Sequence, residues 1–413
     1  MNFRTIRIFT LLSLMFIPAV SFAAQAENKT TVKADTPEQL ETDYRATWQF
    51  IGDRYYDESK LGDWSAWQHR FDGKLHDRND LYQALKTMTA SINDPWTGYY
   101  SPADIEAKKA PDAGHVSAGF WILLDKSGAP YVELCEQGKP AYRSVIRAGD
   151  TIVSVNGTAV AGMTAERVQD LLAGPVGQSL TVEYGDGANH NVSTIVLSEP
   201  EEVQSQARML SDGVLYAKLA AFNRDDIDAF EQAIDKALAK QKEPRGMILD
   251  LRGNPGGFVK GAQYVASMFI EKGVLFTYQS RDGITVTRET MSITEAPFAS
   301  DSPADSRASL LRRVPLVILI DHTTRSAAET VTVALKENGR ARVIGEQSYG
   351  KSIAYDNFPQ DFGGGLELTI ANISSPNGYS WQGKGLTPDV VVARPRVMGT
   401  ADLQLDAAVA NLR

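Results

Sequence analysis

The sequence predicts a multidomain α+β protein with a small helical N-terminal domain, a β-rich domain and an α/β core. Three stretches of different hydrophobic periodicity support this prediction. Apolar residues recur at helical spacing between 36 and 112, and they alternate with a period of two between 113 and 200. From 201 to 413 they form continuous apolar strands separated by amphipathic helices. The length of 413 residues corresponds to about two to three ordinary domains.

The composition excludes several classes of protein. Hydrophobic residues make up 43% of the chain and charged residues 23%, which excludes collagen, a long coiled coil and wholesale disorder. The formal net charge is −9 and no block of Lys and Arg is present, so we expect no nucleic-acid partner. The only cysteine, Cys135, excludes an intrachain disulfide. Its position in the strand-like run 131–135 favours a buried side chain over a catalytic thiol.

Residues 1–23 have the features of a secretory signal peptide. Two arginines precede an uncharged apolar run over 8–20, and Ser21 and Ala23 occupy the −3 and −1 positions of a cleavage site. The apolar run is shorter than the about 20 residues that a membrane anchor needs, so cleavage is favoured over a transmembrane anchor. We therefore expect an exported, periplasmic protein without stable membrane insertion. Because the leader holds two arginines and no acid, cleavage changes the net charge from −9 to −11.

A polar segment, 24–35, is expected to be flexible, and the helical domain follows over 36–112. Thr36-Pro37-Glu38-Gln39 combines an N-cap, a proline in the first turn and a Gln at the capping-box position. Apolar residues then follow at helical spacing, and we interpret them as core: Leu40, Tyr44, Trp48, Ile51 and Tyr55. A second helix near residues 81–92 is ended by Asp94-Pro-Trp-Thr-Gly-Tyr-Tyr100.

The block over 113–200 contains short strands, one tight turn and one helix. Strands are expected near 119–124, 131–135, 151–155 and 180–184, and a helix from about Thr164. Asn156-Gly157 is a typical two-residue hairpin turn. This order, and the run Arg147-Ala-Gly-Asp-Thr-Ile-Val-Ser-Val-Asn-Gly157, resemble a PDZ domain. The alternative is a generic small β-rich domain.

The PDZ resemblance implies a peptide-binding edge. PDZ domains add a peptide strand to a sheet edge and hold the peptide's terminal carboxylate with loop amides. Within Ser117-Ala-Gly-Phe-Trp-Ile122, the candidate peptide-binding residues are Gly119, Phe120 and Trp121.

The α/β core is expected to contain a partly parallel sheet. Continuous apolar strands at 214–219, 247–251 and 317–320 alternate with helices at 225–240, 258–270 and 326–338. Strands that are apolar on both faces are typical of sheets covered by helices. The segment 283–313 is left without an assignment.

Three short segments of this core carry candidate chemistry. Leu249-Asp-Leu-Arg-Gly-Asn-Pro-Gly-Gly257 is a glycine-rich turn after a buried strand, which leaves backbone N–H groups for an anion or oxyanion. A phosphate loop is a poor alternative because no Gly-Lys-Ser/Thr is present. Ser326-Ala-Ala-Glu329 is by itself a capping box, although a serine at a helix N-terminus also suits a nucleophile. Lys351 follows Gly350 in a turn, where a lone lysine is normally solvated.

Together these segments resemble the C-terminal processing (tail-specific) serine protease family. The matching motifs are Asp250-Leu-Arg-Gly-Asn-Pro-Gly-Gly257, Ser326-Ala-Ala-Glu329, Gly345-Glu with Gly350-Lys351, and Gly383-Lys-Gly-Leu-Thr-Pro-Asp389. Asp94-Pro-Trp-Thr-Gly-Tyr-Tyr-Ser-Pro102 looks like the family's N-terminal signature, and the PDZ block precedes the core as in that family. Ser326 and Lys351 are 25 residues apart, as in the family's dyad.

The resemblance implies a crotonase/Clp-like spiral core with a Ser/Lys dyad. Ser326 would be the nucleophile and Lys351 the general base, with Glu329 near the dyad. The N–H groups of Gly256 and Ala327 would form the oxyanion hole, with Gly257 as the neighbouring candidate. Lysine has a reference pKa of about 10.4, so it acts as a base only if it is desolvated.

The same resemblance defines the partners. Substrates would be proteins or peptides with apolar C-termini, and an adaptor protein is a possible further partner. No metal or organic cofactor is implied, and the histidines show no metal-ligand spacing.

One departure from the family leaves alternatives open. Many members carry Gln four residues after the lysine, where this chain has Tyr355. A non-catalytic binding or scaffold protein on the same fold is therefore an alternative, although Ser326 and Lys351 are retained. A hydrolase of small acyl substrates is less compatible with the PDZ block. A Ser/His arrangement using His322 is disfavoured because the sequence places no acid partner.

Overall fold

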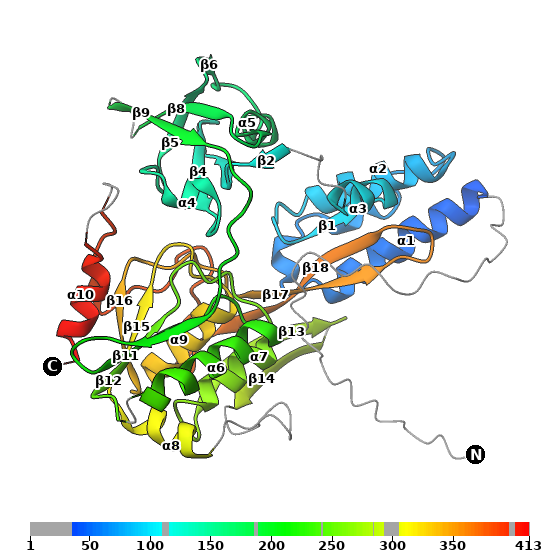
Figure 1. Ribbon diagram of the computed structural model, residues 1–413. Coiled ribbons are helices and arrows are strands. Elements are labelled where there is room, and N and C mark those ends of the chain that lie inside the picture. The colour runs from blue at the N-terminus through cyan, green and yellow to red at the C-terminus, as the bar shows by residue number, and fades with distance from the viewer. Residues whose placement is uncertain are drawn as a thin grey trace, which may run out of the picture.

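The computed structural model describes residues 35–109, 115–185, 189–240, 243–283, 285–292, 305–395 and 401–412. The expected signal peptide and nearly all of the polar segment before residue 36 lie outside the described residues. Among the residues described, no helix is long and apolar enough to cross a membrane. The chain forms a helical N-terminal part, a PDZ-like part and an α/β core (Figure 1).

The N-terminal part contains the two helices that the sequence predicts and a third that was not predicted. They are α1 (Pro37–Arg54), α2 (Arg78–Ala90) and α3 (Pro102–Lys109), with short 3₁₀ turns at Glu58–Lys60 and Trp64–Trp67. The Thr36 hydroxyl accepts the N–H of Gln39 at 3.3 Å, as expected of the N-cap. Four of the five stripe residues of α1 are buried: Leu40, Tyr44, Ile51 and Tyr55. They share a hydrophobic cluster with Leu366 and Leu368 of the core.

The PDZ-like part is a six-stranded antiparallel sheet with two helices. The strand order is β3-β4-β5-β8-β9, and β6 pairs with β5 through the predicted Asn156-Gly157 turn. A two-stranded ladder, β2 with β7, lies outside this sheet. The elements are β2 (His115–Ser117), β3 (Phe120–Leu124), β4 (Pro130–Cys135), α4 (Pro140–Arg143), β5 (Thr151–Val155), β6 (Thr158–Ala159), α5 (Ala165–Leu171), β7 (Ala173–Pro175), β8 (Ser179–Gly185) and β9 (His190–Val196).

Cys135 confirms its interpretation as a core residue. Its side chain is buried in the PDZ-like cluster, and burial raises the pKa of the thiol to about 12. A thiol with such a pKa is not a nucleophile at neutral pH.

The core is built on a six-stranded sheet in the order β10-β11-β12-β15-β16-β19. β10 pairs antiparallel with β11, and the other neighbours are parallel. The strands are β10 (Gln206–Met209), β11 (Val214–Lys218), β12 (Gly246–Asp250), β15 (Leu316–Ile320), β16 (Ala341–Gly345) and β19 (Val390–Val391). The helices are α6 (Arg224–Lys240), α7 (Val259–Ser267), α8 (Asp305–Arg313), α9 (Ala327–Glu337) and α10 (Leu403–Ala410).

Both faces of this sheet are covered, which explains the continuous apolar strands. Alternate strand residues such as Met247 and Ile318 pack with α6, α7 and α9, while Ile248 and Val317 pack under α10 on the opposite face (Figure 1). The prediction of parallel strands covered by helices is therefore confirmed.

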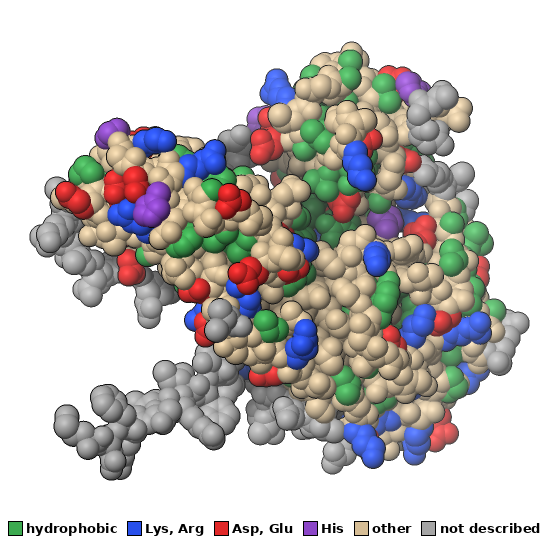
Figure 2. Space-filling view, turned by 180° about the vertical axis from the view of Figure 1, so that it is seen from behind, with side chains coloured by type: hydrophobic (Ala, Val, Ile, Leu, Met, Phe, Trp, Pro, Cys, Tyr) green, Lys and Arg blue, Asp and Glu red, His purple; other side chains and the backbone are tan. Residues whose placement is uncertain are grey.

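A second sheet was not predicted from the sequence. It contains β1 (Gly98–Tyr100), β13 (Val274–Asp282), β14 (Thr285–Ser292), β17 (Ile353–Pro359) and β18 (Gly365–Ser374). β18 pairs with β17, β13 and β1, so one long strand joins the core to the N-terminal part (Figure 1). In the space-filling view the three parts appear as lobes around a hollow, with hydrophobic side chains gathered where the lobes meet (Figure 2).

Candidate active site

Ser326 occupies a strained turn between β15 and α9. Its backbone has φ +58° and ψ −122°, a conformation that residues other than glycine rarely adopt. A strained serine in a strand-to-helix turn is also the geometry of the nucleophile elbow of α/β-hydrolases. The side chain is 6% exposed. The next residue, Ala327, begins α9, so its N–H has no acceptor within the helix.

The carboxylate of Glu329 connects the Ser326 turn to the loop that carries Lys351. Oε2 accepts the N–H of Ser326 at 2.9 Å and the N–H of Lys351 at 2.8 Å. Oε1 accepts the N–H of Gly350 at 2.7 Å and the hydroxyl of Ser348 at 2.5 Å. Burial raises the pKa of Glu329 to about 7, and these four donors oppose that rise because they favour the ionised form. The capping-box hydrogen bond from the Ser326 N–H to Glu329 is thus one of four hydrogen bonds that this carboxylate accepts.

Lys351 is buried, contrary to what is normal for a lysine in a loop. It is 6% exposed, and burial, followed by the positive charge of Arg325, lowers its pKa to about 7. The loop bends sharply at Gly350, which has φ +99°. A Cβ there would lie 2.7 Å from the backbone nitrogen of Gly385, so only glycine fits.

Two aromatic rings face the Lys351 side chain. Its Nζ lies 3.5 Å from the centroid of the Trp96 ring and 4.4 Å from that of Tyr355. The two rings stack with centroids 5.9 Å apart and an interplanar angle of 16°. Trp96 precedes β1, whereas Tyr355 belongs to β17, so the N-terminal part and the core both contact this lysine.

The glycine-rich turn lies directly against Ser326. Gly256 has φ +91°, and a Cβ at this position would lie 2.7 Å from the Cβ of Ser326 and 3.0 Å from the nitrogen of Ala327. The Gly256 N–H donates to the side chain of Asn254 at 2.8 Å. A role for this N–H in an oxyanion hole therefore requires that bond to be exchanged, which makes the neighbouring Gly257 N–H relevant.

Asp321, at the end of β15, holds the turn that precedes Ser326. Its Oδ1 accepts the N–H groups of Gly253, Thr323 and Thr324 at 3.0 to 3.1 Å. Its Oδ2 accepts the hydroxyl of Tyr142, in α4 of the PDZ-like part, at 2.9 Å. One buried carboxylate thus connects the glycine-rich turn, the turn before Ser326 and the PDZ-like part.

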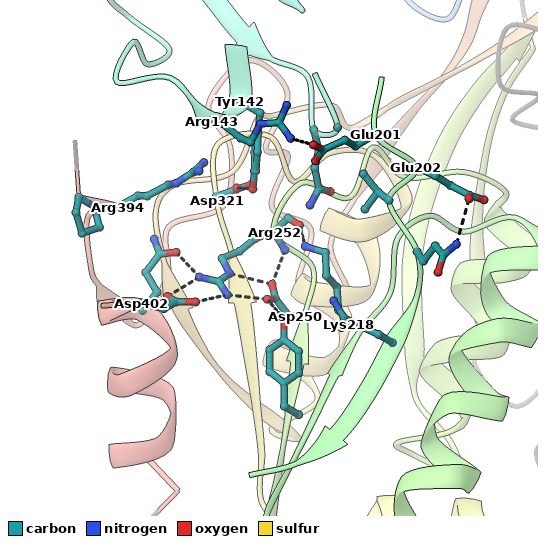
Figure 3. Close-up of a pocket in the computed structure, with 18 of the residues that line it drawn as sticks. Tyr142, Arg143, Glu201, Glu202, Lys218, Asp250, Arg252, Asp321, Arg394 and Asp402 are labelled. Atoms are coloured by element: carbon teal, nitrogen blue, oxygen red, sulfur yellow. Dashed lines mark hydrogen bonds and ion pairs between the residues drawn. The ribbon is translucent and has the colours of Figure 1, made fainter. Parts of the chain in front are cut away.

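A cavity of about 560 Å³ lies where the PDZ-like part, the core and the segment leading into α10 meet (Figure 3). On one side Arg252 pairs with Asp250 at 2.7 Å and with Asp402 at 2.8 Å. Although burial alone would raise it, the charge of Arg252 holds the pKa of Asp250 well below its usual range. These charged groups compensate one another within the cavity wall.

The predicted peptide-binding residues lie on an edge strand that faces α5. Gly119 has φ +91° just before β3, and Phe120 is buried. The indole N–H of Trp121 donates to Glu136 at 2.8 Å. The guanidinium of Arg325, one residue before Ser326, lies 4.8 Å from the ring of Trp121. The candidate peptide strand is therefore adjacent to the turn that carries Ser326.

His322 is directed toward another partner. Its Nδ1 lies 3.7 Å from Oε2 of Glu346, which follows β16. The sequence motifs do not indicate three further residues of the site: Trp96, Asp321 and Arg325. The motif that contains Trp96 was recognised, but nothing in it indicates that its indole contacts Lys351.

Comparisons with known proteins show which families this chain is similar to. The model of peptidase family S41 matches residues 213–392, and the PDZ domain model matches residues 111–184. A chloroplastic C-terminal processing peptidase of Tetradesmus obliquus is 30% identical over 390 residues, covering 89% of this chain and 80% of that protein. A carboxy-terminal-processing protease of Bartonella bacilliformis is 29% identical over 328 residues, covering 77% of this chain and 71% of that protein.

A solved structure shares the fold. A photosystem II D1 C-terminal processing protease superposes with a TM-score of 0.67 and 26% identity, covering 87% of this chain and 95% of that one. The fold and the matched models define a peptidase of family S41 that carries a PDZ domain. The chain belongs to the C-terminal processing peptidase family, which confirms the resemblance drawn from its motifs.

Proposed function

We propose that this peptidase cleaves peptide bonds through a dyad of Ser326 and Lys351. The observation that carries the proposal is the Glu329 carboxylate, which binds the backbone N–H groups of both residues at 2.9 and 2.8 Å. A buried carboxylate that fixes nucleophile and base together holds them in one arrangement during the reaction.

The steps of the reaction follow from ordinary acid–base chemistry. The neutral amine of Lys351 accepts the proton of the Ser326 hydroxyl, and the oxygen attacks the carbonyl carbon of the scissile bond. The N–H of Ala327, with Gly256 or Gly257, stabilises the oxyanion. The ammonium of Lys351 then gives its proton to the leaving amine, and an acyl-enzyme remains on Ser326. Water hydrolyses this ester with Lys351 again acting as the base.

The lowered pKa of Lys351, about 7, supports this role. At neutral pH a substantial fraction of a lysine with this pKa is neutral and able to accept a proton. Glu329 is a positioning residue in this scheme because it acts on the backbone of the dyad and not on the substrate.

We also propose that the PDZ domain selects substrates by their C-termini. The edge of β3 at Gly119, Phe120 and Trp121 would receive an apolar peptide tail as an added strand. Substrates are then proteins or peptides with apolar C-termini, an adaptor protein being compatible with the same surface. In this scheme the dyad belongs to the domain over 201–413 and the site for the peptide tail to the domain over 113–200. The domain over 36–112 would contribute to the surroundings of Lys351. Cleavage of a signal peptide over 1–23 would deliver the enzyme to the periplasm.

One pair of variants tests the catalytic proposal. Ser326→Ala is expected to abolish cleavage of an unfolded protein with an apolar C-terminal tail while it leaves the circular dichroism spectrum unchanged. Ser309→Ala is the matched control, because Ser309 lies exposed on α8. Cleavage by Ser326→Ala at the wild-type rate would refute the dyad.

The second candidate function is that of a non-catalytic binding protein. The reason to consider it is that Tyr355 occupies the position four residues after Lys351, where the resemblance implies Gln. It predicts that the wild-type protein binds apolar C-terminal peptides but leaves an unfolded substrate intact at every pH between 6 and 9. Turnover that Ser326→Ala removes would exclude it.

A further inference from the structure

The surroundings of the Lys351 amine differ from those of an ordinary buried lysine. Its Nζ contacts the faces of two stacked aromatic rings, Trp96 at 3.5 Å and Tyr355 at 4.4 Å from their centroids. Both distances are well within the about 6 Å at which a ring face attracts a cation. The rings lie nearly parallel at 16°, so together they form one aromatic surface for the amine.

Trp96 is held in this place by a turn that Asp94 organises. The carboxylate of Asp94 accepts the N–H of Trp96 at 3.0 Å and the hydroxyl of Thr97 at 3.0 Å. It also accepts the hydroxyl of Thr369, in β18, at 2.7 Å and that of Tyr55, after α1, at 3.1 Å. The Trp96 turn is thus fixed to the core and to the first helix at once.

The position of Tyr355 also depends on Thr369 of β18. It is the partner of Thr369 in the ladder between β17 and β18, directly after an irregularity in register at Ala354. An irregularity of this kind redirects the side chains of the strand. Thr369 therefore fixes the two rings relative to each other. It is the ladder partner of Tyr355, and its hydroxyl donates to Asp94, which organises the turn of Trp96.

The charged groups around Lys351 come from four segments. Arg325 precedes α9 and opposes the ammonium, whereas Glu329 in α9, Asp94 before β1 and Glu367 in β18 favour it. Burial disfavours the ammonium, while the ring faces attract it. The amine of Lys351 must accept a proton in one step and donate it in a later step. Its neutral and its ammonium form therefore both have to be held at the same position.

Building on the proposed dyad, we propose that Trp96 and Tyr355 form an aromatic clamp that positions the Nζ of Lys351 and stabilises its ammonium form. The N-terminal part thereby contributes a positioning residue to the catalytic centre.

The clamp is tested by removing the ring face while apolar bulk is kept. Trp96→Leu keeps water out but abolishes the attraction for the ammonium. We expect the acidic limb of kcat/KM on a fluorescence-quenched casein to move to lower pH by roughly half a unit to one and a half units. We also expect the plateau kcat to fall because the amine is less well positioned. Tyr355→Leu is expected to act in the same direction from the other ring, and Trp96→Phe is expected to restore the wild-type limb.

Trp67→Leu is the matched control for the loss of a tryptophan and a cation contact in the same part of the chain. The guanidinium of Arg70 lies 4.4 Å from the Trp67 ring, far along the chain from the turn at Asp94. This variant is expected to keep the wild-type pH profile. A lower kcat in Trp96→Leu and Tyr355→Leu with an unmoved acidic limb would overturn the clamp, since a structural defect alone would give that result.

The dyad and the clamp fail in different ways. If Lys351→Ala cleaves casein at the wild-type rate, the dyad is wrong and the clamp falls with it. If Lys351→Ala is inactive and the Leu variants keep the wild-type limb, the clamp alone is wrong. If Trp96→Leu does not fold, the acidic limb of kcat/KM in Tyr355→Leu decides: a shift to lower pH supports the clamp, and an unmoved limb refutes it.

Discussion

Glu329 accepts the backbone N–H of Lys351 at 2.8 Å, although the two residues lie on different elements and one of them is the expected base. The same oxygen accepts the N–H of Ser326. A single buried carboxylate thus determines where the strained serine turn and the lysine loop lie relative to each other. This relationship explains why a residue that begins as an ordinary capping-box glutamate becomes central to the site.

Glu329→Gln is expected to reduce kcat strongly and to lower the free energy of unfolding. A glutamine side chain has one oxygen, so its NH₂ group would face backbone donors and leave at least one of them unpaired. Each unpaired buried donor costs about 1–3 kcal/mol, which corresponds to roughly a fivefold to 150-fold loss of kcat if the cost falls on the transition state.

Urea denaturation and kcat measured together check this expectation. Glu337→Gln is the control, because Glu337 lies at the end of the same helix and accepts a hydrogen bond from the N–H of Asn377. Wild-type kcat in Glu329→Gln would show that the network has no catalytic importance.

The activity should rise with pH across the neutral range. Only the neutral amine of Lys351 accepts a proton, and its pKa is about 7. Protonation of Glu329, whose pKa is also about 7, would remove acceptors for the backbone donors in the same range. The logarithm of kcat/KM is therefore expected to fall below pH 7 with a slope steeper than one. A profile that is flat from pH 5 to 8 would contradict the assignment of Lys351 as base.

Lys351→Met should make the protein more stable at neutral pH while it abolishes activity. The folded pKa of about 7 lies below the unfolded value of 10.5, so the native state binds fewer protons between these two values. The stability of the wild type therefore rises with pH in that window. The advantage of Lys351→Met is expected to be at least about 1 kcal/mol at pH 7 and to shrink toward pH 10. Urea denaturation at both pH values measures it, and an advantage that grows with pH would be the contrary result.

Gly256→Ala should abolish activity and destabilise the fold. The residue has φ +91°, and a Cβ there would lie 2.7 Å from the Cβ of Ser326. Gly162→Ala separates the two effects, because Gly162 also has a positive φ, +78°, but no atom within 4 Å of the added Cβ. The control is expected to lose about 1 kcal/mol of stability through strain and to keep its activity. Full activity in Gly256→Ala would show that the close approach to Ser326 is unimportant.

Local patterns in the sequence were sufficient for much of the fold. The core strands and helices lie within a few residues of their predicted ranges, since a helix of period 3.6 or a strand buried on both faces is visible in single segments. The hairpins over 274–292 and 353–374 were missed. The run Leu366-Glu-Leu-Thr-Ile370 alternates and was overlooked, whereas Val274–Asp282 combines polar and apolar residues without a clear alternation. Pairing within the sheet defines these strands: β13 pairs with β14 and β18, and β18 also pairs with β17 and β1.

The sequence by itself determined the candidates: Ser326, Glu329, Lys351 and the glycine-rich turn stand in recognisable motifs, and the PDZ order is continuous along the chain. Only the tertiary structure decided that Lys351 is buried, that Trp96 faces its amine and that Gly256 contacts Ser326. Those properties arise where separate surfaces meet. Hydrophobic periodicity tells which face of an element is buried, but the partner of that face depends on how β18 brings the N-terminal part onto the core.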